Sequence, residues 1–364
     1  KRLSGRDWFE KMKHPHRDLT FYAQLSHNYK EGKTIEDKVD RMLNVLCAHG
    51  FQIEFQEKDI KSNHISEKYR VRGHKSIEKM EDEMTSIEWY TKSIAYALPD
   101  SKELALAYRS RALTLFEHEH YELCLVDISR SLAIDVPDLS NIKMYCIRLR
   151  CLIALKRPEE EIAVALRQAK QALSIMDPND PERSSHAKII EIAENRSPPQ
   201  AKPQAKPQAK PQSDNDRFTV SEINDSSCEI RGATGLAIAY SKNHGKHVVA
   251  TRDIRPGEVI ALVDSYTKML HMSDFHKKCA YCMETTLIGI PCDYCVNSIY
   301  CSESCRTAAW EEYHENECAM LDRLLELEVG PHGLLVTRAF LKGLKEVGGL
   351  DNMKKVITDI DAYP

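Results

Sequence analysis

Eight cysteine and histidine residues lie within forty positions of this chain, and they constrain its fold more than any other feature. They follow the spacing C-x2-C-x9-C-x2-C-x5-C-x3-C-x8-H-x3-C and are Cys279, Cys282, Cys292, Cys295, Cys301, Cys305, His314 and Cys318. Four protein ligands fill a tetrahedral zinc site, so eight ligands predict two structural sites with no open position for a catalytic water. The segment has few apolar residues, so binding of each ion would supply folding free energy, roughly ten kcal/mol.

The spacing also predicts how the ligands are shared between the two ions. Each C-x2-C pair can form one knuckle, and ligands four residues apart on a helix lie on the same face. We therefore expect an interleaved arrangement with two sets of four. One set is Cys279, Cys282, Cys301 and Cys305, and the other is Cys292, Cys295, His314 and Cys318.

The other five cysteines are scattered, at Cys47, Cys124, Cys146, Cys151 and Cys228. Disulfides suit small secreted domains, whereas this chain has 364 residues and no apolar signal-like segment at its start. We interpret the five as buried, reduced thiols. No apolar run is long enough to cross a membrane, and a net charge of −4 gives no positive excess to attract nucleic acid or an anionic membrane.

From about residue 7 to residue 190 the pattern is helical, with apolar residues at three- and four-residue steps. Three apolar segments each run into a proline, at Pro99, Pro137 and Pro178, which lie 38 and 41 residues apart. The repeat resembles tetratricopeptide (TPR) hairpins with lengthened loops, and a generic helical bundle is the alternative. We expect an N-terminal helical region over 1–76 and TPR-like repeats over 77–196, which would offer a peptide-binding surface.

Residues 197–216 interrupt the helical pattern with three copies of Ala-Lys-Pro-Gln. Proline at every fourth position prevents a helix, and the segment offers no apolar core. We predict a disordered, proline-rich linker, and we prefer a spacer to a ligand for a proline-binding module.

Beyond the linker, over 217–276, the pattern becomes strand-like and predicts a small antiparallel β portion. Short runs rich in β-branched residues alternate with turn residues; they are 218–220, 228–230, 235–240, 247–251 and 258–263. From about residue 320 two apolar stripes again predict helices.

The order of the metal ligands points to one class of zinc finger. RING fingers carry histidine at the fourth, or the fourth and fifth, ligand, whereas here the single histidine is the seventh, with Trp310 four residues before it. Residues 277–318 thus resemble a MYND finger, which disfavours a zinc-finger ubiquitin ligase. The resemblance implies binding of short proline-containing peptides, and the acidic surroundings of the ligands make a phosphate backbone a poor partner.

The segment before the finger resembles the opening hairpin of SET domains. It reads His247-Val248-Val249-Ala250-Thr251-Arg252-Asp253-Ile254-Arg255-Pro256-Gly257-Glu258. A SET opening followed by a MYND finger and then helices resembles the SMYD (SET and MYND domain-containing) family, in its TPR-bearing type. The resemblance implies a multidomain α+β fold: an all-α TPR-like array, then a small antiparallel SET portion with an inserted MYND finger, then helices. It also implies a protein-lysine N-methyltransferase that uses S-adenosylmethionine.

Carried over by position, the family's first cofactor-binding turn corresponds to His244, Gly245 and Lys246. Gly245 permits close backbone approach, and Lys246 supplies a cation for the methionine carboxylate. His244 and His247 stand where the family has lysine and a second glycine. An ordinary β-turn with solvated basic residues is the alternative.

No catalytic residue is expected among residues 1–364, because neither an Asn-His-Ser-type motif nor a late channel tyrosine follows Cys318. We therefore expect 319–364 to be a truncated helical SET insert and this segment alone to be inactive. The competing hypothesis is a non-enzymatic TPR–MYND adaptor. Expected partners are a substrate lysine and peptide-motif proteins that bind the TPR-like and MYND regions. We expect no membrane, a location in the cytoplasm, the nucleus or both, and two structural Zn²⁺ ions.

Overall fold

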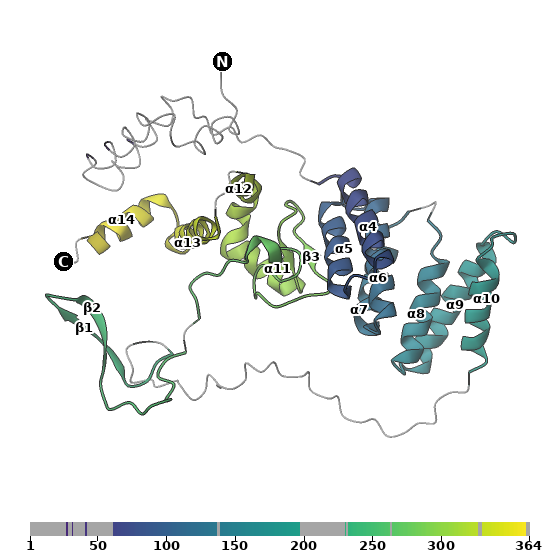
Figure 1. Ribbon diagram of the computed structural model, residues 1–364, viewed down its shortest axis with the longest axis horizontal. Coiled ribbons are helices and arrows are strands. Elements are labelled where there is room, and N and C mark those ends of the chain that lie inside the picture. Colours follow the sequence, from purple (N-terminus) through teal and green to yellow (C-terminus); the bar gives the residue numbers. More distant parts are fainter. Residues whose placement is uncertain are drawn as a thin grey trace, which may run out of the picture. The chain divides into compact units, whose positions relative to one another are not determined.

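Helices dominate the part of the chain that the structure describes (Figure 1). The computed structural model describes residues 61–136, 139–196, 230, 232–262, 264–326 and 330–361, together with residues 27, 31 and 41. The linker predicted at 197–216, the strand predicted at 218–220 and nearly all of residues 1–60 lie outside the described residues.

Seven helices occupy the described part of the predicted helical region. They are α4 (Asn63–Glu78), α5 (Glu83–Tyr96), α6 (Lys102–Glu117), α7 (Tyr121–Ala133), α8 (Ile142–Ala154), α9 (Glu159–Ile175) and α10 (Arg183–Glu194). Helices α5 and α6 begin at the side-chain caps Asp82 and Ser101, each of which accepts an amide hydrogen bond from the first turn.

Three pairs of consecutive helices share one turn geometry. The pairs α4–α5, α6–α7 and α8–α9 each pack against one another. Each turn contains one non-glycine residue at positive φ, namely Met80, Glu119 and Lys156. The following amide donates to the carbonyl five residues earlier, in the bonds Glu81 to Ser76, His120 to Leu115 and Arg157 to Leu152. These bonds satisfy terminal carbonyl groups, so the same local chemistry ends α4, α6 and α8.

The second helix of each pair ends shortly before a predicted proline stop. After α5 and α9 the chain turns extended at Ala97 and Met176, and Pro99 and Pro178 follow. Proline lacks an amide hydrogen and disfavours helix in the residue before it, which accounts for these ends. The third stop, Pro137, lies outside the described residues.

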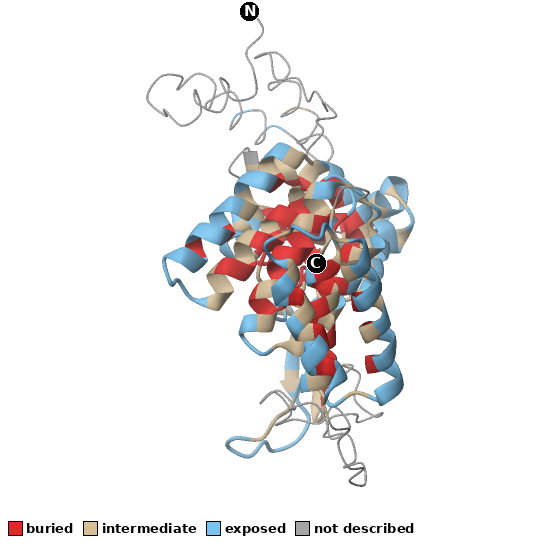
Figure 2. Ribbon diagram, turned by 90° about the vertical axis from the view of Figure 1, so that its right-hand side faces the viewer, coloured by how far each residue is buried: buried red, intermediate tan, exposed pale blue. Residues whose placement is uncertain are grey.

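Small residues allow the helices of the first pair to approach closely. A Cβ added at Gly73 of α4 would lie 2.5 Å from the Tyr90 ring of α5. The hydroxyl of Ser66 donates to the Ser93 carbonyl at 2.8 Å, and the Ser93 hydroxyl donates back to the Ser66 carbonyl. Buried residues accordingly lie along the inward sides of the helices in Figure 2.

The chain divides into two compact units. The first unit comprises residues 1–139 and 270–336, and the second comprises 140–269 and 337–364. The predicted zinc finger therefore shares a unit with α4–α7.

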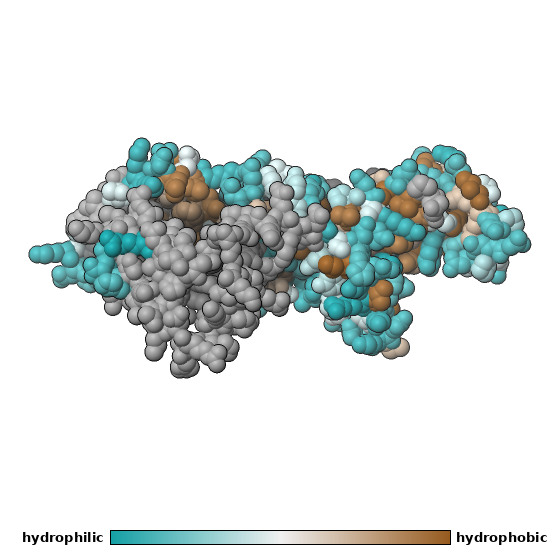
Figure 3. Space-filling model, turned by 90° about the horizontal axis from the view of Figure 1, so that it is seen from above, coloured by the Kyte–Doolittle hydropathy of each residue, from teal (hydrophilic) through white to brown (hydrophobic). Residues whose placement is uncertain are grey.

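In Figure 3 hydrophilic side chains cover much of the visible described surface, with apolar ones in separate patches. Among the described residues, no helix combines the length and apolar content needed to span a bilayer.

The second unit contains an antiparallel hairpin of β1 (Leu236–Ser241) and β2 (Gly245–Ala250), in the register Ile238 to Val248. It matches two of the predicted strands. The strand predicted at 258–263 is wrong for its described part, 258–262, which forms only an isolated bridge between Ala233 and Ala261. Gly232, at φ +77°, approaches the Leu262 carbonyl closely, and among the described residues the bonds Thr234 to Ile260 and Leu262 to Gly232 join the two segments.

The predicted C-terminal helices are present as α12 (Glu315–Glu326), α13 (Pro331–Val347) and α14 (Leu350–Asp361). Helix α13 opens with proline at its first position, where the missing amide hydrogen costs nothing, and Gly348 follows its end at φ +78°. The Tyr266 hydroxyl donates to Glu346 at 2.8 Å, and Arg338 donates to the Lys268 carbonyl at 2.6 Å. These bonds attach the segment before the finger to α13.

Candidate metal centre

The structure brings the eight predicted ligands together in two groups of four. The first cluster is Cys279, Cys282, Cys301 and Cys305, and the second cluster is Cys292, Cys295, His314 and Cys318. Within each cluster the donor atoms all lie within 4.8 Å of one another. This is the interleaved arrangement that the spacing predicts. None of the cysteines that the structure describes forms a disulfide.

The donor separations fit tetrahedral zinc. Zn–S bonds of about 2.3 Å place two sulfur ligands about 3.8 Å apart at the edge of a tetrahedron. The Cys282 and Cys301 sulfur atoms are 3.7 Å apart, and those of Cys301 and Cys305 are 3.6 Å apart. In the second cluster the sulfur atoms of Cys292 and Cys318 are 3.7 Å apart. Four protein donors per ion leave no position for water, so the sites suit structural metal.

A short hairpin and two helical turns position the first cluster. Cys279 and Cys282 lie in a knuckle that turns at Met283, which has φ +68°. Cys301 follows β4 (Ile299–Tyr300), which pairs with β3 (Ile290–Pro291), and Cys305 lies in α11 (Glu303–Ala309). The Ser302 hydroxyl caps α11 by accepting from the Cys305 amide. Burial opposes ionisation of Cys279, but amide hydrogen bonds from Cys282, Cys301 and Tyr281 lower its pKa.

A π-helical turn, Trp310–His314 (η3), orients the second cluster. His314 Nε2 lies 3.3 Å from the sulfur of Cys292 and 3.5 Å from that of Cys295, so Nε2 faces the metal position. Its Nδ1 lies 3.2 Å from the Glu317 carboxylate, and both side chains are buried. A carboxylate on the second ring nitrogen fixes the tautomer and orientation of a zinc-bound histidine. Hydrogen bonds from Cys295 and Cys318 lower the pKa of Cys292 and so favour the ligating thiolate.

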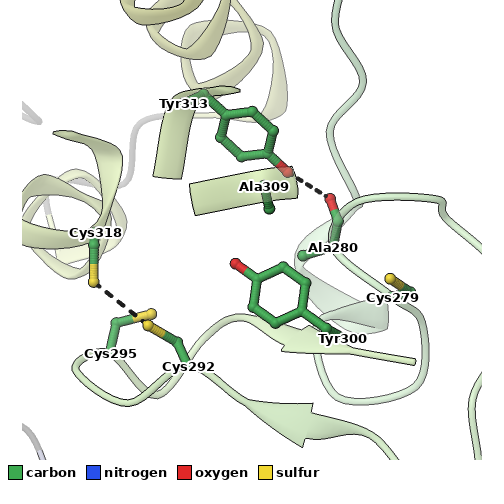
Figure 4. Close-up of a cluster of buried hydrophobic side chains, with 8 residues drawn as sticks. All are labelled: Cys279, Ala280, Cys292, Cys295, Tyr300, Ala309, Tyr313 and Cys318. Atoms are coloured by element: carbon green, nitrogen blue, oxygen red, sulfur yellow. Dashed lines mark hydrogen bonds between the residues drawn. The ribbon is translucent and has the colours of Figure 1, made fainter. Parts of the chain in front are cut away.

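One buried aromatic core separates the two clusters. Figure 4 shows the Tyr300 ring between Cys279 on one side and Cys292, Cys295 and Cys318 on the other. The Tyr313 hydroxyl donates to the Ala280 carbonyl at 3.0 Å, which ties the π-turn to the first knuckle. The clusters differ in exposure: all four ligands of the second are buried, whereas Cys282, Cys301 and Cys305 are partly exposed.

Lys61, which precedes α4, places a cation near the second cluster. Its Nζ donates to the Ala95 carbonyl at 2.7 Å. Burial lowers the pKa of Lys61, while the negative charges of Cys295, Cys292 and Asp293 oppose that shift. Neither Lys61 nor Glu317 is predicted from the sequence as part of the site. Glu317 is three residues after His314, a spacing that could have identified it, whereas nothing in the sequence links Lys61 to a cluster more than 200 residues away.

Two arginines beside a buried aspartate in the helices donate hydrogen bonds to backbone carbonyls of the finger. Arg111 of α6 forms two bonds with Asp127 of α7, at 2.6 and 3.0 Å, and both side chains are fully buried. Arg111 also donates to Thr91 and to the Gly289 carbonyl, at 3.0 and 3.2 Å. Arg130 donates to Asp127 and to the Ile288 carbonyl, each at 3.0 Å. Side chains of helices α6 and α7 therefore hydrogen-bond to the backbone of the loop that joins the two C-x2-C knuckles, and Thr91 of α5 binds one of them, Arg111.

The predicted cofactor residues lie in the second unit, at the turn between β1 and β2. The His244 amide donates to Ser241, Gly245 has φ +60°, and Lys246 pairs with Tyr240 in the hairpin register. A Cβ added at Gly245 would meet no atom within 4 Å, so the turn leaves open space on that side.

Comparisons with known proteins agree with these features. Residues 279–318 match the family model described as MYND finger. The chain is 28% identical over 315 residues to Protein-lysine N-methyltransferase SMYD4 of Pongo abelii, and equally to that of Homo sapiens; each match covers 80% of this chain and 37% of the relative. It is 30% identical over 132 residues to Histone-lysine N-methyltransferase ASHR1 of Arabidopsis thaliana, which covers 35% of this chain and 26% of that protein.

The chain thus spans well under half the length of these curated relatives. No solved structure matches it.

Proposed function

We propose, from the confirmed resemblance to the SMYD family, that this chain is part of a protein-lysine N-methyltransferase that uses S-adenosylmethionine. One observation carries the proposal: two closed four-ligand clusters directly follow a SET-like hairpin, in a chain whose relatives are named as protein-lysine methyltransferases. Those names also make the enzyme a better hypothesis than the non-enzymatic adaptor.

The two clusters would hold structural zinc, and the donor separations support that metal. Zinc would supply folding free energy and no reaction step. The eight ligands instead fix the knuckles, α11 and the π-turn in one arrangement.

The β1–β2 turn is our proposed cofactor contact. Gly245 leaves room for a ligand beside the backbone, and Lys246 would face the methionine carboxylate of S-adenosylmethionine. S-adenosylmethionine would supply the methyl group, and these residues would bind and orient it.

The α4–α10 helices are our proposed TPR-like region, supported by three hairpins with the same turn geometry. With the finger they would recognise protein partners, among them the substrate that carries the lysine. We propose a cytoplasmic or nuclear location and domains bounded as the sequence indicates, at 1–76, 77–196, 197–216, 217–276, 277–318 and 319–364.

The test compares residues 1–364 with a longer protein that continues past Pro364. We expect methyl transfer from radiolabelled S-adenosylmethionine to a protein lysine by the longer protein only, and weak cofactor binding by residues 1–364 in calorimetry. Lys246→Ala should weaken that binding, whereas the matched control Lys242→Ala in the same turn should not. Robust lysine methylation by residues 1–364 would overturn the proposal that this segment lacks the catalytic residues. No methylation by the longer protein across a protein array would overturn the enzyme.

A further inference from the structure

We propose that the first cluster, Cys279, Cys282, Cys301 and Cys305, is a site of reversible thiol oxidation by hydroperoxides, and that the second cluster is protected. The proposal requires that the clusters hold zinc, but it does not depend on methyltransferase activity. It rests on three differences between the clusters, which concern exposure, charge and the contacts of the ligands.

Exposure is the first difference. Cys282, Cys301 and Cys305 are partly exposed, whereas every ligand of the second cluster is buried and Cys295 is 0% exposed. Oxidation of cysteine follows both thiolate character and access of the oxidant. Only the first cluster therefore has partly exposed ligand residues, which favours access of a small dissolved peroxide to that cluster.

Charge is the second difference. Four thiolates around a dication leave more negative charge than three thiolates and a neutral histidine, so the sulfur atoms of the first cluster are richer in electrons. The second cluster also has the Lys61 cation nearby. Arg306, the cation beside Cys305 in sequence, is instead engaged with Asp293 and Glu303, at 2.8 and 2.9 Å. The first cluster therefore holds the more nucleophilic sulfur atoms.

The third difference is how firmly the ligands are held, because both clusters contain sulfur pairs no more than 3.7 Å apart. Cys301 Sγ lies 3.7 Å from Cys282 Sγ and 3.6 Å from Cys305 Sγ, so it has a possible disulfide partner on either side. A disulfide needs an S–S distance of about 2.05 Å, so the two sulfur atoms must close by about 1.6 Å. In the second cluster, the hydrogen bond that His314 Nδ1 donates to the Glu317 carboxylate and the burial of all four ligands resist such a movement.

The chemistry balances with a hydroperoxide as the oxidant. One thiolate attacks the O–O bond and becomes a sulfenic acid, and hydroxide leaves. A second thiolate attacks that sulfur, the S–S bond forms and the sulfenic oxygen leaves as hydroxide. With two protons, hydrogen peroxide is reduced to two water molecules while the two sulfur atoms together lose two electrons. The cluster thereby loses two of its ligands and releases its ion.

Oxidation of the first cluster would change the structure around α11 and leave the loop that contacts the helices in place. Cys301 and Cys305 bracket the start of α11, and α11 leads to Trp310, whose ring centroid lies 5.3 Å from that of the exposed Tyr294. Oxidation would free the start of α11 and shift this aromatic pair. The Ile288 and Gly289 carbonyls would keep their bonds to Arg130 and Arg111.

The test treats the zinc-loaded chain with hydrogen peroxide, follows zinc release with a colorimetric chelator, and maps the cysteines by alkylation and mass spectrometry. We expect release of one of the two ions in a fast phase, with Cys301 in a disulfide and Cys292, Cys295 and Cys318 intact. Dithiothreitol with added zinc should restore both ions. Release of both ions in a single phase, earlier oxidation of the second cluster, or no release at all would overturn the proposal.

A variant tests the protection by Lys61. Lys61→Met should leave the fast phase unchanged and speed the slow release severalfold, because a neutral side chain no longer offsets the negative charge of the second cluster. Lys68→Met, an exposed site on α4, is the matched control, and Lys61→Arg should restore slow release. Far-UV circular dichroism before oxidation checks that each variant is folded. An unchanged slow phase in folded Lys61→Met would overturn the role of Lys61.

Discussion

Removal of the Asp127 carboxylate should destabilise α6 and α7 strongly. Asp127 is fully buried and accepts two bonds from Arg111 and one from Arg130. In Asp127→Ala the Arg111 cation stays buried with only the neutral acceptors Thr91 and Gly289. Loss of one partner of a buried ion pair costs about 3–5 kcal/mol, because the remaining charge is neither hydrated nor neutralised.

A double variant separates the cost of an unpaired charge from the value of the pair. Arg111→Met with Asp127→Leu removes both charges and fills similar volume, a change that is often near neutral in other proteins. Here it also removes the bond to the Gly289 carbonyl, which is worth about 1 kcal/mol. We therefore expect the double variant to be less destabilised than Asp127→Ala by about 2 kcal/mol or more.

Native-state hydrogen exchange at the α6 and α7 amides is the appropriate assay, because it reports local opening free energy whatever the other unit does. Glu194→Ala, which breaks the exposed pair of Glu194 with Lys170, is the control and should change stability by less than about 0.5 kcal/mol. A cost below about 1 kcal/mol for Asp127→Ala, or a double variant less stable than the single one, would refute the reasoning.

Three further results are expected. Gly73→Ala should lower the thermal midpoint by overpacking against Tyr90, at a cost of about 1–3 kcal/mol, and an unchanged midpoint would show that the ring moves freely. Glu317→Ala should weaken zinc binding by about 10–100-fold in a chelator competition, while Glu315→Ala, at an exposed position two residues earlier, should not. His276 is buried, and its Nε2 donates to the Val296 carbonyl at 2.8 Å. Burial lowers the pKa of His276 to about 4, so its contribution to stability is complete above the unfolded pKa of about 6.5 and is lost as the pH falls toward 4. Between pH 7.5 and 5.5 the chain should lose roughly 1 kcal/mol more than His276→Gln in urea unfolding, and equal losses would contradict this.

The two clusters of four Cys and His residues were predictable because their parts are local in sequence. Knuckles and helical turns fix the separation of residues two to four positions apart, so C-x2-C, Cys301 with Cys305, and His314 with Cys318 could be paired from spacing alone. The helix ends before Pro99 and Pro178 and the β1–β2 hairpin were predictable for the same reason.

What the sequence did not reveal depends on contacts between distant segments. The bond from Arg111 to Gly289 joins residues 178 positions apart, and no periodicity marks either of them as a partner. The strand expected at 258–263 failed for a related reason. Its composition favours a strand, but a strand needs a continuous partner, and the described residues provide a single bridge, Ala233 with Ala261.

The contacts between the helices and the finger differ in the side chains that they allow at positions 288 and 289 of the finger. Arg111 and Arg130 bind carbonyl oxygens, which every amino acid carries, so the attachment does not select the side chain at position 288. Position 289 is different, because a Cβ there would lie 2.6 Å from Ile299. A side chain at position 289 is therefore disfavoured by the buried Ile299, whereas the bonds to Arg111 and Arg130 place no requirement on the side chain at position 288. A finger transplanted from another protein should dock on these helices if it keeps the loop conformation and a glycine at that one position.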